Sequence, residues 1–207
     1  MARLSRRLVI AAAMLATLAA CNKSGASLGA PGPEDMTMGN PNAKVLVAEY
    51  ASVGCPVCAA FNNETFPAFK AKYIDTGKVH YVLHEMLVGG QGEQALAAAG
   101  FLLARCAGKD KYFAVNDEIF HVQQQLYTSG DLRGGLLRIA QSMGMTEPQF
   151  NTCIGDQNAL KALNARVEKA GKDGVNQTPT FIVNGKQMVG NLPLADLDKA
   201  IADAAKN

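Results

Sequence analysis

Two cysteines stand three positions apart at Cys55 and Cys58, with Pro56 and Val57 between them. The pair follows an apolar run and precedes a helical pattern, the setting of a redox dithiol. If Cys55 caps that helix, its sulfur faces free backbone N–H groups and the positive end of the helix dipole, which favours the thiolate. The thiolate is the nucleophile of disulfide exchange. We therefore predict that Cys55 is the nucleophile and that Cys58, one turn along, is the shielded thiol that resolves a mixed disulfide.

Two other roles of a CxxC pair have to be weighed against a redox role. A zinc site needs four ligands, but Cys21, Cys106 and Cys153 are single and widely spaced, and no HxxxH pattern completes a set. A structural disulfide between the two thiols would close a tight loop, and strained bonds of this kind are typical of redox chemistry. The spacing therefore favours the redox role, with the other two as alternatives.

The composition is that of an ordinary globular chain of 207 residues, with 48% hydrophobic and 18% charged residues. This length suits one domain that carries an insertion. The net charge of +2 comes from the N-terminal segment, because removing Arg3, Arg6 and Arg7 from the 20 basic residues leaves 17 against 18 acidic ones. There is no basic run, so we expect no nucleic-acid partner, and no motif indicates a bound cofactor or metal.

Residues 1–20 have the form of a secretory signal peptide: three arginines at the start and an almost unbroken apolar stretch over 8–20. That stretch is short for a transmembrane helix, although a retained membrane anchor is the alternative. The segment ends in the letters LAAC, which resemble the bacterial lipobox and imply acylation of Cys21 after cleavage. By the same resemblance, Asn22 favours the outer membrane over the inner one.

Composition and periodicity divide the remaining chain into a tether and three segments. Residues 21–40 are rich in Gly, Ser, Ala and Pro without periodicity, and predict a lipid-anchored flexible tether. Residues 41–90 and 175–207 form a sheet domain, and residues 91–174 between them show helical periods throughout. Because the tether is too short to hold a dimerisation domain, we expect a monomer.

The predicted elements alternate between strand and helix on both sides of the helical segment. They are a strand over 44–52, a helix over 56–74 kinked at Pro67, a strand over 78–86, a hairpin over 180–189 with an Asn-Gly turn, and a closing helix that begins near Leu194. Glu49 interrupts the first strand. A carboxylate in such a strand is costly unless it is paired or accepts protons; the alternative is that it faces solvent.

This order of elements, with Glu49, the CxxC pair and Thr178-Pro179 ahead of an apolar strand, resembles the DsbA-like branch of the thioredoxin superfamily over residues 44–206. The resemblance implies an α/β fold class, a thioredoxin-like fold with an inserted all-helical subdomain. It implies that Pro179 is cis and faces the dithiol, where backbone pairs with an extended substrate. An ordinary trans proline is the alternative. It also implies that Glu49 relays a proton to or from Cys58.

Val57 departs from the histidine that the strongest oxidants of this family carry between their cysteines. A histidine cation would stabilise the Cys55 thiolate and therefore the reduced form. Because Val57 supplies no charge, we expect a potential less oxidising than that of the strongest members.

Cys106 and Cys153 lie 47 positions apart within the helical segment. In an oxidising compartment they suggest a structural disulfide between the first and fourth helices of that segment. Two free buried thiols are the alternative.

These features predict a membrane-tethered, periplasmic thiol:disulfide oxidoreductase that oxidises cysteines of secreted proteins. The resemblance implies a quinone-linked membrane partner that reoxidises it. Thr178 keeps a disulfide reductase or isomerase with an electron donor open, although the missing dimerisation domain argues against it. A different class is a non-enzymatic metal- or peptide-binding chaperone that uses the same groove; a peptide chaperone would keep its function after Cys55→Ser.

Overall fold

The computed structural model of the chain describes residues 28–206, which form a five-stranded sheet and its covering helices. The strands are β1 (Met36–Gly39), β2 (Val45–Ala51), β3 (Val79–Glu85), β4 (Thr180–Val183) and β5 (Lys186–Val189). The helices are α1 (Pro56–Glu64), α2 (Phe66–Phe69), the π-helical η1 (Lys70–Ile74), α3 (Gln91–Cys106), α4 (Lys109–Ser129), α5 (Leu132–Ser142), α6 (Glu147–Ile154), α7 (Gln157–Lys172) and α8 (Leu194–Lys206).

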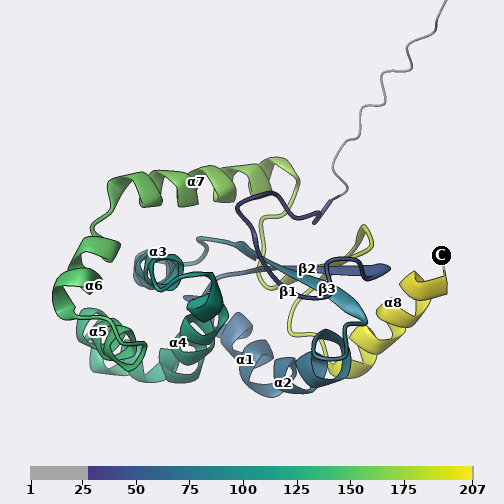
Figure 1. Cartoon of the computed structure of the whole chain (residues 1–207), viewed down its shortest axis with the longest axis horizontal. Helices are drawn as coiled ribbons and strands as arrows, with labels where there is room; N and C mark the ends of the chain where they lie inside the picture. Colours follow the sequence, from purple (N-terminus) through teal and green to yellow (C-terminus); the bar gives the residue numbers. More distant parts are fainter. Residues whose placement is uncertain (1–27, 207) are drawn as a thin grey trace, which may run out of the picture.

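The sheet has the strand order β1-β3-β2-β4-β5, with β2 parallel to β3 and antiparallel to β4. Helices α1, α2 and α8 cover one face, α7 and the segment before β1 cover the other, and α3 to α6 extend from one end (Figure 1). Strand β2 is central and covered on both faces, so nearly all of its residues are buried. This explains why its sequence is an almost continuous apolar run. The α/β class with an inserted helical region, predicted from the sequence, is confirmed.

A buried ionic cluster around Glu85, at the end of β3, joins the helical insertion to the sheet. Glu85 Oε1 accepts from Nε of Arg105, on α3, at 2.6 Å, and Glu85 Oε2 accepts from Nε of Arg166, on α7, at 2.8 Å. The hydroxyl of Tyr112, on α4, also donates to Glu85 at 2.9 Å. Because removing one partner of a buried ion pair leaves an uncompensated charge, loss of either arginine should destabilise the contact between the insertion and the sheet.

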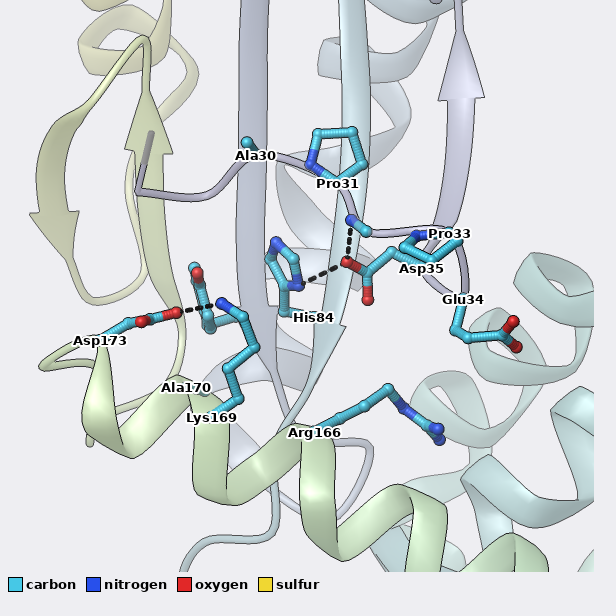
Figure 2. A pocket seen from close by; sticks show the side chains of 12 residues that line it. Ala30, Pro31, Pro33, Glu34, Asp35, His84, Arg166, Lys169, Ala170 and Asp173 are labelled. Atoms are coloured by element: carbon cyan, nitrogen blue, oxygen red, sulfur yellow. Dashed lines mark hydrogen bonds and ion pairs between the residues drawn. The ribbon is translucent and has the colours of Figure 1, made fainter. Parts of the chain in front are cut away.

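The predicted tether over residues 21–40 is wrong for its C-terminal part. Strand β1 pairs antiparallel with β3, Met36 lies opposite Leu83, and Gly29 packs against Ala48 and Ile182 of the sheet. Figure 2 shows the segment between them, with Asp35 directed at His84. The Pro- and Gly-rich composition concealed a short edge strand, which extends the folded domain back to residue 28; residues 21–27 lie outside the described part.

The helix predicted over 56–74 is broken into three pieces. Helix α1 ends at Glu64, α2 begins at Phe66, and the chain continues as the π-helical turn η1. Pro67 lies in the first turn of α2, where its missing N–H costs nothing, so the proline starts a new helix instead of kinking a long one. In the described part of the chain, no helix has the length and apolarity needed to cross a membrane.

Candidate active site

The dithiol lies where strand β2 passes into helix α1. Cys55 is the N-cap of α1, with extended backbone angles (φ −85°, ψ 122°), and Pro56 takes the first helical position. Both cysteines are free thiols. Cys55 is 9% exposed, whereas Cys58 is completely buried, so only the first sulfur can be reached from outside.

The environment of the two sulfurs separates their acidities. The Cys58 thiol donates to the Cys55 sulfur, which lowers the pKa of Cys55 to about 5 against the opposing effect of burial. Thr178 and the backbone N–H groups of Val57 and Cys58 lower it further. Burial raises the pKa of Cys58, and its hydrogen bond to Cys55 adds to that rise. The negative charge of the reduced dithiol is therefore held on Cys55, the accessible sulfur.

The loop that precedes β4 lies next to Cys55. Its Thr178–Pro179 peptide bond is cis, as the family resemblance implied. The sulfur of Cys55 lies 3.7 Å from the carbonyl oxygen of Thr178. On the other side of the loop, the carbonyl of Pro179 accepts from the N–H of Gly190 at 2.8 Å, which ties the loop to the end of β5.

Glu49 is buried in the middle of β2, the strand that leads to the dithiol. Glu49 is only 4% exposed, so the alternative of a solvent-facing carboxylate is wrong. Burial raises the pKa of Glu49 to about 7, although a hydrogen bond from the Tyr81 hydroxyl, at 2.6 Å, opposes the rise. Burial raises the pKa of Tyr81, and Glu49, Tyr112 and Cys58 add to the rise in that order. Tyr81 therefore lies within electrostatic range of both Glu49 and the Cys58 sulfur. A carboxyl with a pKa near neutrality can either give or take a proton.

Comparison with known proteins places this arrangement in a family. A family model described as thioredoxin matches residues 32–203. Among solved structures, α-DsbA1 of Wolbachia pipientis superposes with a TM-score of 0.75 at 27% identity, over 85% of this chain and 95% of that one. The chain is a DsbA-like member of the thioredoxin superfamily.

Curated relatives of this DsbA-like chain carry names from disulfide chemistry. A protein of Rickettsia bellii named "Putative protein-disulfide oxidoreductase" is 36% identical over 177 residues, which cover 82% of this chain and 66% of the relative. "Disulfide bond formation protein D" of Bacillus subtilis is 25% identical over 153 residues, 72% of this chain and 67% of that protein. The DsbA-like chain thus spans just under two thirds of the Rickettsia relative.

The helical insertion supports the active-site loop through contacts that sequence reasoning missed. On α4, Gln123 donates from its Nε2 atom to the carbonyl oxygens of Val53 at 2.8 Å and Cys55 at 3.2 Å. One turn later, the Tyr127 hydroxyl donates to the carbonyl of Gly54 at 2.6 Å. These bonds satisfy three consecutive backbone acceptors at the end of β2 and hold the loop that presents the nucleophile.

The remaining predicted cysteines lie away from the dithiol. Cys106 and Cys153 are joined in a disulfide between α3 and α6, with Cα atoms 5.8 Å apart, which excludes the alternative of two free thiols. Cys21, the predicted lipidation site, lies outside the described residues. Within those residues, no cluster of three or more His, Cys, Asp or Glu side chains is placed to hold a metal ion.

Proposed function

We propose that this chain is an extracytoplasmic thiol:disulfide oxidoreductase that transfers its Cys55–Cys58 disulfide to cysteines of secreted proteins. The observation that carries the proposal is the position of Cys55 at the N-cap of α1 beside Cys58, where hydrogen bonds from Cys58 and from backbone N–H groups lower the pKa of Cys55 to about 5. Stabilising the thiolate stabilises the reduced dithiol, and a protein with a stable reduced form is a strong electron acceptor. The names of the curated relatives agree with this class of reaction.

The reaction proceeds by two exchanges at sulfur. A substrate thiolate attacks the sulfur of Cys55, forms a mixed disulfide and expels Cys58 as a thiolate, which Glu49 protonates. A second substrate thiolate attacks the substrate sulfur of the mixed disulfide and expels Cys55 as its stable thiolate. Two electrons pass from the two substrate thiols to the dithiol, and the substrate leaves with a new disulfide.

The loop at Thr178 and Pro179 is the proposed binding edge for an extended substrate segment. Strand addition to this loop would bring a substrate cysteine to Cys55, because the Thr178 carbonyl already lies 3.7 Å from that sulfur. Val57, 45% exposed between the cysteines, and Val189, 46% exposed at the end of β5, are the exposed large apolar side chains of the described chain. Their exposure suits contact with apolar residues of an unfolded substrate.

The proposed location is the periplasm, with the chain anchored to a membrane through acylated Cys21. The charged head and apolar stretch of residues 1–20 and the LAAC sequence support this placement, and Asn22 favours the outer membrane. The proposed partners are partly folded secreted proteins and a quinone-linked membrane protein that restores the disulfide. The chain is proposed to act as a monomer.

The reduction potential of the dithiol tests the direction of electron flow. Equilibration of the full chain with glutathione buffers, together with the thiolate absorbance of Cys55 against pH, should give a potential between those of thioredoxin and the most oxidising DsbA proteins, about −270 and −120 mV. A thioredoxin-like potential with a thiolate pKa near 7 would indicate a reductase or isomerase, the second candidate that Thr178 favours. If Cys55→Ser still protects an unfolded protein from aggregation, this would indicate a non-enzymatic chaperone.

A further inference from the structure

A small cavity lies against the buried carboxyl of Glu49, between α1, α4 and the sheet. Its volume is about 30 Å³. Its polar lining comes from Glu49, Tyr81, Asn62, Asn116 and Asp117, and Leu83 and three phenylalanines close the rest. A buried water needs about 10 to 15 Å³ and two to four polar partners, so this cavity meets both requirements for a water molecule.

Asn116, on α4, lines this cavity and has no role in the proposed exchange reaction. Its residue is 2% exposed, and neither its Nδ2 nor its Oδ1 atom has a hydrogen-bond partner of good geometry among residues 28–206, although the amide lies close enough to the Tyr112 hydroxyl to offset part of the rise in the pKa of Tyr112. Buried amide groups of this kind are nearly always satisfied, because an unmade hydrogen bond leaves the cost of removing the group from water uncompensated. The amide lines the cavity and offers a donor and an acceptor to a water there.

The far end of the cavity reaches solvent through Asp117. Asn62, on α1, donates from Nδ2 to Asp117 Oδ1 at 2.8 Å, and the Asp117 side chain is 53% exposed. His121 lies beside it, with Nδ1 3.5 Å from the same carboxylate oxygen. The cavity thus has Glu49 at its inner end and a solvated carboxylate at its outer end.

We propose that Asn116 is a positioning residue that holds a water molecule against Glu49, and that this water and the Asp117 carboxylate, which Asn62 holds in place, form the route by which Glu49 exchanges protons with solvent. This inference rests on the proposed function, in which Glu49 protonates the Cys58 thiolate. The carboxylate left behind takes a proton from bulk water through the route, one proton for each substrate oxidised. During reoxidation one proton leaves by the same path.

Other ionisable groups that face this route come from three elements. Tyr81 on β3 donates directly to Glu49, Cys58 on α1 lies within electrostatic range of Tyr81, and Asp117 and His121 on α4 stand at the mouth. The competing role for Asn116 is support of Tyr112, one turn earlier on α4, whose hydroxyl donates to Glu85. A test must therefore separate a hydrated cavity from packing around Tyr112.

The experiment compares Asn116→Leu with Asn116→Ser in the full chain. Leucine removes both amide partners and fills the space, whereas serine keeps a hydroxyl and leaves room for water. The first readout is an infrared titration of the Glu49 carboxyl, assigned by its loss in Glu49→Gln. The second is the pH dependence of the stopped-flow rate at which the disulfide form oxidises a cysteine peptide.

For Asn116→Leu we expect the midpoint of the Glu49 titration to rise by about one pH unit, because drying the cavity disfavours the carboxylate. We expect the exchange rate to fall about tenfold at pH values above the raised midpoint, because there Glu49 starts ionised and must first take a proton through the blocked route before it can act as a general acid. Asn116→Ser should stay within about twofold of the parent rate. Unchanged titration and pH profile in Asn116→Leu, or equal defects in both variants, would overturn the proposal.

Two controls separate this inference from its premises. The first control is Ile139→Val, at a buried position of α5 away from the cavity, and the second is Tyr112→Phe. Both should leave the midpoint of the Glu49 titration unchanged. A shift in Tyr112→Phe equal to that of Asn116→Leu would mean that Asn116 acts through packing around Tyr112. Absence of any exchange by the unaltered chain would refute the proposed function, while the infrared titration would still decide whether Asn116 hydrates Glu49.

Discussion

The hydroxyl of Tyr81 donates a 2.6 Å hydrogen bond to Glu49 Oε2 between the two parallel strands at the centre of the sheet. Glu49 lies opposite Leu83 and Tyr81 lies opposite Val47, so the two side chains are diagonal neighbours on one face. The bond favours the ionised carboxylate, yet burial outweighs it and leaves the pKa of Glu49 at about 7. The folded protein therefore binds a proton at Glu49 more tightly than the unfolded chain does.

Glu49→Gln should make the folded protein more stable at alkaline pH relative to the parent chain. The folded pKa of about 7 exceeds the ordinary value of 4.5, so the parent gains full stability from this group below pH 4.5 and loses it as pH rises through 7. The difference in unfolding free energy, variant minus parent, should rise by about 3 kcal/mol between acid and alkaline pH.

Urea denaturation at a series of pH values measures this difference. Glu64→Gln, at an exposed position at the end of α1, is the matched control and should show no such pH dependence. A difference for Glu49→Gln that stays constant across the series would mean that the carboxyl is ionised in the folded protein at all these pH values.

The residues of the dithiol could be predicted because their signals are local. Cys55 and Cys58 are three positions apart, and the hairpin turn at Asn184 and Gly185 needs the left-handed angles that these residue types tolerate, φ 43° and 87°. Both signals depend on a few consecutive residues, so no knowledge of packing is required. The helical insertion could likewise be placed by its period alone.

The partners of the site could not be predicted because they depend on how distant segments pack. Gln123 is a glutamine in a polar run of α4, and nothing in its neighbours along the chain indicates that it faces the loop at Cys55. The need for glycine at position 54 also comes from a distant segment. A Cβ atom on Gly54 would lie 2.0 Å from the carbonyl oxygen of Glu93. Strand β1 was missed because four residues at a sheet edge carry too little periodicity.

Gln123→Leu should weaken the active-site loop. The change leaves the carbonyls of Val53 and Cys55 without their side-chain donor in a buried setting, so we expect a loss of about 1 to 3 kcal/mol in unfolding free energy. The rate of exchange with a cysteine peptide should also fall several-fold, because the nucleophile is held less firmly.

Urea denaturation and stopped-flow exchange measure the two effects. Gln124→Leu, on the exposed side of the same helix turn, is the matched control and should change neither by much. Equal behaviour of the two variants would show that the side chain of Gln123 is dispensable for the loop.

The disulfide between Cys106 and Cys153 should contribute substantially to stability. Replacing both cysteines by serine opens a loop with a sequence separation of 47. In the chain-entropy model, closing a loop of this length stabilises the folded state by about 4 kcal/mol. Non-reducing urea denaturation should show this loss in the double variant, and Cys106→Ser alone should match it. A midpoint equal to that of the parent would mean that the bond does not restrict the unfolded chain.

His84 joins the segment before β1 to the back of the sheet. Figure 2 shows its ring directed at Asp35, which also accepts from the backbone N–H of Gly32 at 2.7 Å. The Nδ1 atom lies 3.5 Å from Asp35 Oδ2, and Nε2 lies 3.3 Å from the carbonyl oxygen of Gly29. On its other side the ring stacks on Tyr50, with centroids 4.4 Å apart. Both ring nitrogens therefore face acceptors contributed by the segment 28–35.

Asp35→Asn should loosen this segment at neutral pH. Burial raises the pKa of Asp35, but the hydrogen bonds from His84 and Gly32 outweigh it, and the net pKa is lowered from 3.8. A lowered folded pKa means that the ionised group stabilises the fold above pH 3.8 and that this stability is lost as pH falls through the folded value. The neutral amide should cost about 1 to 2 kcal/mol near neutrality, the worth of a charge-assisted hydrogen bond, and the cost should shrink in acid.

Urea denaturation against pH and amide hydrogen exchange of β1 measure both effects, with Glu34→Gln at the exposed neighbouring position as control. Protection of β1 that is unchanged in Asp35→Asn would show that strand pairing alone, without the contact to His84, holds this segment on the sheet.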